Sequence, residues 1–190
     1  MPANRTRNTA TAQRRQRQIE DCLFENLQHN PWSSISVADI CRQVGISRKA
    51  YYNYYKDKTD CFCSYVDWLL RDSALEITQS LPDNATALET AVALLDHWKK
   101  QKAFLDVIVN NDLLIILIQR NVQYVLTEDR SVLKLLSTDE SDMDILTCYT
   151  SVQLALLLCW YYRGFDTPTE EMAKKFLRLL HQPFIPANEP

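Results

Sequence analysis

Apolar side chains recur at the spacing of an α-helix along most of the chain. Between about residues 13 and 29, Ile19, Cys22 and Leu23 fall on one face of an amphipathic helix. Another long pattern starts near Asp57 and continues to a loop at residues 81–84. Further helical patterns cover about residues 86–100, 103–110, 113–126, 132–136, 143–162 and 169–182. Because no stretch has a convincing strand pattern, the sequence predicts an all-α fold whose larger part is a helical bundle.

Two short helices are predicted between these long patterns. Ser36 lies three residues before Asp39, which is the spacing of a capping box at a helix N-terminus. Gly45 follows the last apolar residue of this helix, where a left-handed terminus favours a residue without Cβ. Ser47 can cap the next short helix, which we expect to run to about Tyr55. Two short helices joined by so brief a turn predict a helix-turn-helix.

The glycine content and the length of the apolar runs narrow the class of protein. There are 2 glycines in 190 residues, which argues against phosphate-binding loops of βαβ units and against sheets rich in hairpins. The longest apolar runs, Leu113–Ile118 and Leu154–Tyr162, are far shorter than the roughly 18 residues of a membrane span. The polar, Arg-rich residues 1–18 do not resemble a secretory signal. We therefore expect a cytoplasmic protein without a membrane partner.

Charge is distributed unevenly along the chain. Residues 1–58 contain ten Lys or Arg and five Asp or Glu, whereas the rest contains eleven and nineteen, which together give the net charge of −3. A basic segment ahead of an acidic body is typical of a protein whose first third meets a polyanion, although short basic termini are also common as solvated tails.

The cysteines and histidines do not form a recognisable catalytic or metal-binding motif. Cys61 and Cys63 are spaced C-x-C, not the C-x-x-C of zinc sites. His29, His97 and His181 lie far apart in sequence, and no nucleophile elbow accompanies them. We therefore expect no metal, no cofactor and no enzymatic activity. The cysteines are expected to be reduced, with Cys22 and Cys41 as small core residues, and a thiol sensor stays an open alternative.

The second short helix has the side chains of a DNA-reading surface. Tyr51 and Tyr55 are four residues apart and are expected to pack on the preceding helices. Arg48 and Asn53 face outward, and these residue types read guanine and adenine, respectively, in the major groove. The neighbouring Tyr52, Tyr54 and Lys58 suit contacts with phosphates. The alternative, that the tyrosines are only core aromatics, is retained for Tyr51 and Tyr55.

Residues 36–60, SVADICRQVGISRKAYYNYYKDKTD, resemble the signature of TetR-family (tetracycline-repressor-like) transcriptional regulators. The likeness covers about residues 19–70 and is most specific in Gly45 and the Tyr-x-Tyr-Tyr-x-x-Lys sequence that ends at Lys58. Two positions depart from the family pattern, since Lys49 replaces a small Gly or Pro and Ala50 replaces a Thr. These departures affect the individual contacts rather than the class.

The resemblance implies a helix-turn-helix followed by a ligand-binding and dimerisation bundle. It suggests a basic arm over residues 1–12 that we expect to be disordered, a DNA-binding domain over 13–58, a ligand-binding and dimerisation domain over 59–182, and a tail over 183–190. Base contacts are assigned by resemblance to Arg48, Lys49 and Asn53. Phosphate or backbone contacts are assigned to Val37, Ala38, Ser47, Tyr52, Tyr54 and Lys58.

The resemblance also implies a homodimer on a palindromic operator and a small-molecule inducer that releases a repressor from DNA. Because large aromatics mixed with isolated polar groups suit a ligand cavity, we expect its lining to be Tyr65, Trp68, His97, Trp98, Asn110 and Gln119. The expected dimer face is Val152, Leu156, Cys159, Trp160, Phe176, Leu179 and Leu180. Two alternatives stay open: these apolar rows fill the monomer core, and a protein partner rather than a small ligand controls the regulator.

Overall fold

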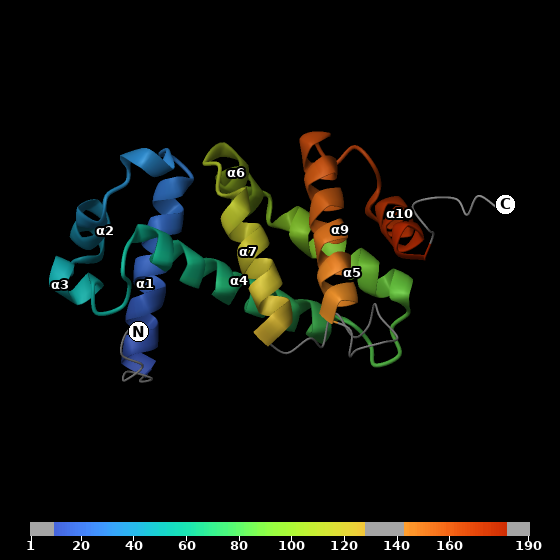
Figure 1. Ribbon diagram of the computed structural model, residues 1–190, viewed down its shortest axis with the longest axis horizontal. Coiled ribbons are helices and arrows are strands. Elements are labelled where there is room, and N and C mark those ends of the chain that lie inside the picture. The colour runs from blue at the N-terminus through green and yellow to red at the C-terminus, as the bar shows by residue number, and fades with distance from the viewer. Residues whose placement is uncertain (1–9, 128–142, 182–190) are drawn as a thin grey trace. The chain divides into compact units, whose positions relative to one another are not determined.

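The computed structural model describes residues 10–127 and 143–181, and within them every regular element is helical (Figure 1). The elements are α1 (Ala10–Leu27), η1 (Trp32–Ser34), α2 (Val37–Val44), α3 (Arg48–Tyr51), α4 (Lys58–Ser80), α5 (Ala87–Lys100), α6 (Lys102–Asn110), α7 (Leu114–Thr127), α9 (Met143–Tyr162) and α10 (Thr169–His181). The predicted all-α fold is confirmed. The expected helix at 132–136, most of the N-terminal arm and the C-terminal tail lie outside the described residues.

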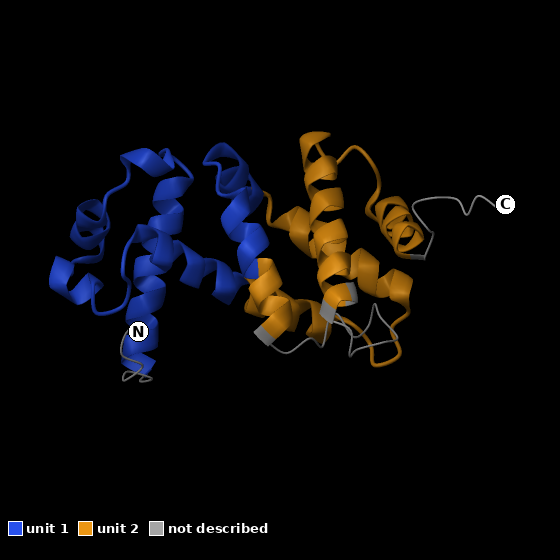
Figure 2. Ribbon diagram, viewed as in Figure 1, with its two compact units in different colours: residues 1–69, 103–120 blue, residues 70–102, 121–190 orange. Residues whose placement is uncertain are grey.

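The described residues form two compact units (Figure 2). Unit 1 takes its residues from 1–69 and 103–120, and unit 2 from 70–102 and 121–190. Helices α4 and α7 each contribute residues to both units. The functional boundary that the sequence suggests at residue 58 stays a prediction.

Local sequence signals fix the short helices of unit 1. The Ser36 hydroxyl accepts a hydrogen bond from the Asp39 amide, and the Asp39 carboxylate accepts one from the Ser36 amide, so the predicted capping box is confirmed. Gly45 has φ of +71°, a left-handed conformation that ends α2 and that residues with Cβ rarely adopt. The Ser47 hydroxyl caps α3 by accepting from the Ala50 amide at 3.1 Å.

Helix α3 is shorter than the sequence pattern indicates. The prediction that it runs to Tyr55 is wrong, because the α-helix ends at Tyr51 and the following residues form a hydrogen-bonded turn. In this turn the Tyr54 and Tyr55 amides both donate to the Tyr51 carbonyl, at 2.9 and 3.1 Å. Helical side-chain spacing therefore continues past the end of the helix, which explains why periodicity overestimates its length.

Unit 1 has a core of aliphatic and aromatic side chains from α1, α2, α4 and α6. Ile19, Leu23 and Ile40 are fully buried, as are Phe62 and Phe104. Close packing of this kind supplies the main stabilisation of a small helical unit.

Unit 2 is built on α5, α9 and α10. Trp160 of α9 and Phe176 of α10 are fully buried, and the Trp160 indole N–H donates to the Thr167 carbonyl at 3.1 Å. The Lys99 ammonium lies 4.9 Å from the Trp160 ring centre. The assignment of Trp160 and Phe176 to a dimer face is therefore wrong, because both side chains fill the interior of unit 2.

Among the described residues, none of the helices combines the length and apolar character that crossing a membrane requires.

Candidate nucleic-acid interface

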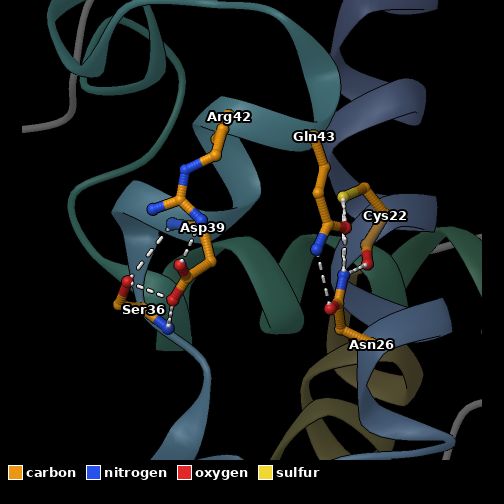
Figure 3. A network of polar contacts seen from close by, with 6 residues as sticks. All are labelled: Cys22, Asn26, Ser36, Asp39, Arg42 and Gln43. Carbon is orange, nitrogen blue, oxygen red and sulfur yellow. Dashed lines mark hydrogen bonds and ion pairs between the residues drawn. The ribbon is translucent and has the colours of Figure 1, made fainter.

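The helix-turn-helix consists of α2, the turn at Gly45 and α3, and α1 supports it. Figure 3 shows the polar contacts that join α1 to α2. The side-chain amides of Asn26 and Gln43 bond reciprocally, at 2.7 and 3.1 Å, and the Cys22 thiol donates to the Gln43 oxygen at 3.2 Å. Because these bonds and the buried Ile40 act together, α2 is held on α1 by both polar and apolar contacts.

The side chains of the second short helix and its turn divide into a buried and an exposed set, as the spacing predicts. Tyr51 and Tyr55 are buried, which confirms them as core residues. Arg48, Lys49 and Asn53 are exposed. The exposed set presents two cations and one amide without an acidic side chain among them, which suits the edges of bases and the charge of phosphates.

The flanking residues assigned to the DNA backbone differ in their exposure. Ala38 and Ser47 are exposed, whereas Val37 and Tyr54 are half-buried. Tyr52 is 48% exposed and forms a hydrogen bond with Arg48, which raises the pKa of the Arg48 guanidinium. Arg48 is therefore held beside a hydroxyl and stays charged at every physiological pH.

Lys58 does not lie where the sequence analysis placed it. Its ammonium donates to the Ile35 carbonyl at 2.6 Å and to the Trp32 carbonyl, and it lies 4.3 Å from the centre of the Trp32 ring. Burial lowers the pKa of this half-buried amine. The expected phosphate contact conflicts with this geometry, because Lys58 binds carbonyl groups of its own chain.

Glu20 is a buried acidic residue that the sequence analysis missed. Its carboxylate accepts hydrogen bonds from the hydroxyls of Tyr55 and Ser64, at 2.8 and 2.6 Å, and from the Arg17 guanidinium at 2.5 Å. The Glu20 carboxylate also helps burial to raise the pKa of Tyr55. This one side chain therefore joins α1, the end of the reading turn and α4.

The six residues predicted to line a ligand pocket belong to different units. Tyr65, Trp68, Asn110 and Gln119 are in unit 1, whereas His97 and Trp98 are in unit 2. The Tyr65 ring stacks on Phe24 with centres 4.7 Å apart, and the Arg17 guanidinium lies 3.4 Å from the Trp68 ring centre. The assignment of these six residues to one ligand pocket therefore stays a prediction.

Two of the predicted pocket residues take part in local features, His97 in a polar cluster and Asn110 in a cleft. In unit 2, the His97 Nε2 and the Ser73 hydroxyl are 2.9 Å apart, and Glu76 lies 3.4 Å from His97 Nδ1. Burial lowers the pKa of His97. In unit 1, a cleft of about 140 Å³ is lined by Leu27, Gln28, His29, Ala103, Asp106, Val107 and Asn110. Asn110 is the one predicted pocket residue in that lining.

The described residues contain no group of three or more His, Cys, Asp or Glu side chains placed to hold a metal ion.

The remaining residues of the expected dimer face are at least partly accessible. Val152, Leu156 and Leu180 are half-buried, Cys159 is exposed, and Leu179 is 37% exposed. These residues all belong to α9 and α10 of unit 2.

The helix-turn-helix and the helical units give this chain the fold of TetR-like transcriptional regulators. No protein-family model matches the chain, and no curated protein matches it at the significance required. Solved structures with 16–18% sequence identity to this chain establish its fold.

Three solved structures have similar folds. The fatty acid degradation regulator FadR from Bacillus halodurans is 16% identical, with a TM-score of 0.57, and the match covers 87% of this chain and 94% of that chain. A protein assigned to the TetR family from Syntrophomonas wolfei is 17% identical, with a TM-score of 0.56 and coverage of 93% and 100%. The dihydroxyacetone kinase operon activator DhaS is 18% identical, with a TM-score of 0.51 and coverage of 87% and 93%.

Proposed function

We propose that this protein is a cytoplasmic transcriptional regulator that binds a palindromic DNA operator as a homodimer. The observation that carries the proposal is the exposed set of Arg48, Lys49 and Asn53 on a reading segment whose Tyr51 and Tyr55 are buried. Anchored aromatics fix the segment while the polar side chains stay exposed and can meet bases. The surplus of basic residues before residue 59 supplies attraction to the phosphates.

The proposed contacts divide by chemistry. Arg48 and Lys49 donate to acceptors on guanine, and Asn53 both donates to and accepts from adenine. Tyr52, Tyr54, Ser47 and the N-terminal residues of α2, Val37 and Ala38, contact the backbone of the duplex and fix the register. Lys58 is left out of this set because its ammonium is bound to the carbonyls of Trp32 and Ile35.

A homodimer is supported by the outward surface of α9. Ala155, Cys159 and Tyr162 are exposed on this helix, and Tyr162 is 68% exposed. A helix that is apolar on its core side and also on its outer side needs a second partner for the outer side. A two-fold dimer through this surface would bring two reading segments to the two halves of a palindrome.

We further propose that a small molecule acts as inducer and releases a repressor from DNA. The solved proteins with this fold include one described as a regulator of fatty acid degradation and one described as an operon activator, which supports control of metabolic genes. Ser73 and His97 supply polar atoms in unit 2, and a ligand would need orienting groups of this kind. An inducer must favour the conformation that does not bind DNA, because affinity alone shifts no equilibrium.

Control by a protein partner is the second candidate. Ile115 and Ile118 of α7 are 60% and 39% exposed, and exposed apolar side chains of this kind suit a protein surface. A thermal-shift screen of small metabolites distinguishes the two, since a ligand that both raises the melting temperature and releases DNA supports the inducer.

The first prediction concerns base recognition. Arg48→Ala or Asn53→Ala is expected to lower the preference for the selected operator over a mismatched duplex by about 1–3 kcal/mol each, because each removes a bidentate base contact. Binding of each variant is measured against duplexes that the wild-type protein selects from a random pool. Lys175→Ala on α10 is the control, since it removes one exposed cation from unit 2. Equal preference in the Arg48 and Asn53 variants and the wild type would contradict the assignment.

A further inference from the structure

The side chain of Asn111 joins the turn between α6 and α7 to η1, the segment that precedes the helix-turn-helix. Its amide nitrogen donates to the Val107 carbonyl at 3.0 Å, near the C-terminus of α6. Its oxygen accepts from the backbone amide of Trp32 at 2.6 Å. Asn111 and Trp32 are 79 residues apart in sequence and belong to the same unit. Both polar ends of this side chain are therefore used, one on each partner.

Trp32 is the first residue of η1, so its amide has no partner within that helix. Asn111 supplies the missing acceptor. The Trp32 ring contacts Phe62 of α4 edge to face, with centres 5.7 Å apart, and it also faces the Lys58 ammonium. The ring is thus packed on α4 while the amide is held from the α6–α7 turn.

Lys58 completes the connection at the first residue of α4. It donates to the carbonyls of Trp32 and Ile35, and these two residues bracket the short η1 segment. Ile35 directly precedes Ser36, the N-cap of α2. The side chains of Asn111, Trp32 and Lys58 therefore hold residues 32–36, the segment that leads into α2.

We propose that Asn111 and Lys58 are positioning residues that set the orientation of the DNA-reading segment through η1, without touching DNA. The proposal rests on the DNA-binding function proposed above. A reading segment must be held close to its productive geometry, and the apparent affinity falls in proportion to the fraction of molecules that hold it there. Loss of Asn111 leaves the Trp32 amide without this acceptor, and loss of Lys58 leaves the Trp32 and Ile35 carbonyls without this donor. Either loss is expected to widen the range of orientations of α2 and α3.

The distinction from a phosphate ligand can be measured. A lysine that neutralises a phosphate contributes about one unit per half-site to the slope of log affinity against log salt. A positioning lysine lowers affinity at every salt concentration and leaves that slope unchanged. It also changes the free protein, because its hydrogen bonds exist without DNA.

The test uses Asn111→Ala, Asn111→Asp and Lys58→Met in the full chain, with Asn84→Ala as the matched control at an exposed asparagine of unit 2. The first readout is amide hydrogen exchange without DNA. We expect faster exchange over residues 32–44 in Asn111→Ala and Lys58→Met, with α5 and α10 unchanged. Asn111→Asp keeps the acceptor for Trp32 and is expected to restore protection in part. Wild-type exchange rates over residues 32–44 in Lys58→Met and Asn111→Ala would overturn the proposal.

The second readout is affinity for the duplex that the wild-type protein selects from a random pool, measured across salt concentrations. Both loss variants are expected to bind on the order of 10-fold more weakly, as for a lost hydrogen bond that leaves its partner unsatisfied, with an unchanged salt slope. The double variant is expected to lose less than the two single losses combined, because both act through η1. A slope lowered by about one in Lys58→Met would instead identify a phosphate ligand and overturn the proposal. If the wild-type protein selects no duplex, the DNA-binding function fails, and the exchange data alone then decide whether η1 is held from both sides.

Discussion

Glu20→Ala is expected to destabilise the protein by about 3–5 kcal/mol, which is the range for breaking a buried ionic hydrogen-bond network by removing one partner. The side chain of Glu20 is almost completely buried and accepts bonds from Arg17, Tyr55 and Ser64. Alanine removes the acceptor of the Ser64 hydroxyl, leaves the Tyr55 hydroxyl with only its longer contact of 3.4 Å to the Gln16 carbonyl, and leaves the partly buried Arg17 guanidinium without this counter-ion. The loss of free energy of unfolding is measured by urea denaturation at one fixed protein concentration.

Two variants make this result specific. Glu25→Ala removes an exposed carboxylate from the same helix and is expected to change stability by no more than about 0.5 kcal/mol. Glu20→Gln keeps an oxygen acceptor for Tyr55 and is expected to fall between the wild type and the alanine variant. A Glu20→Ala protein as stable as Glu25→Ala would show that the network does not hold the reading turn on α1 and α4.

The parts of the fold that the sequence predicts correctly depend on local signals. The capping box at Ser36 and the left-handed Gly45 are readable because their partners lie within a few residues. Helix α9 occupies the predicted residues 143–162, since apolar residues occur throughout this stretch and polar residues flank it. Tyr51 and Tyr55 are readable as core residues because they share one face of the reading segment.

The parts that were missed depend on contacts between distant residues. Arg17 and Glu20 are three residues apart, a spacing also typical of a solvated surface pair, and nothing local shows that Tyr55 and Ser64 bury the carboxylate. The inward direction of Lys58 depends on carbonyls that η1 presents only in the folded chain. Asn111 has no signal of its own, because its acceptor role needs Trp32, 79 residues away.

The error at Trp160 and Phe176 has a different cause. Helix α9 has apolar residues on every side, so its periodicity cannot distinguish the row that faces α5 and α10 from the row that faces outward. Trp160 lies in the inward row and is fully buried, whereas Cys159, its neighbour in sequence, is exposed. The exposed row is therefore what a second subunit would cover.

Charging this outer surface is expected to produce a monomer that folds and loses most of its affinity for a palindromic operator. Ala155→Glu combined with Tyr162→Glu places carboxylates at two exposed positions of the outer row of α9. In the proposed dimer these carboxylates would be buried without partners and would face their symmetry mates, so we expect association to be lost. Unit 2 is expected to stay folded because Trp160 and Phe176 remain buried in its interior. Sedimentation gives the oligomeric state, circular dichroism the helix content, and binding to full and half operators the affinity. The control is Gln79→Glu with Asn84→Glu, which adds the same charge at two exposed positions of unit 2. The control is expected to stay dimeric. A dimer that persists in the Ala155 and Tyr162 variant with unchanged operator affinity would show that another surface joins the subunits.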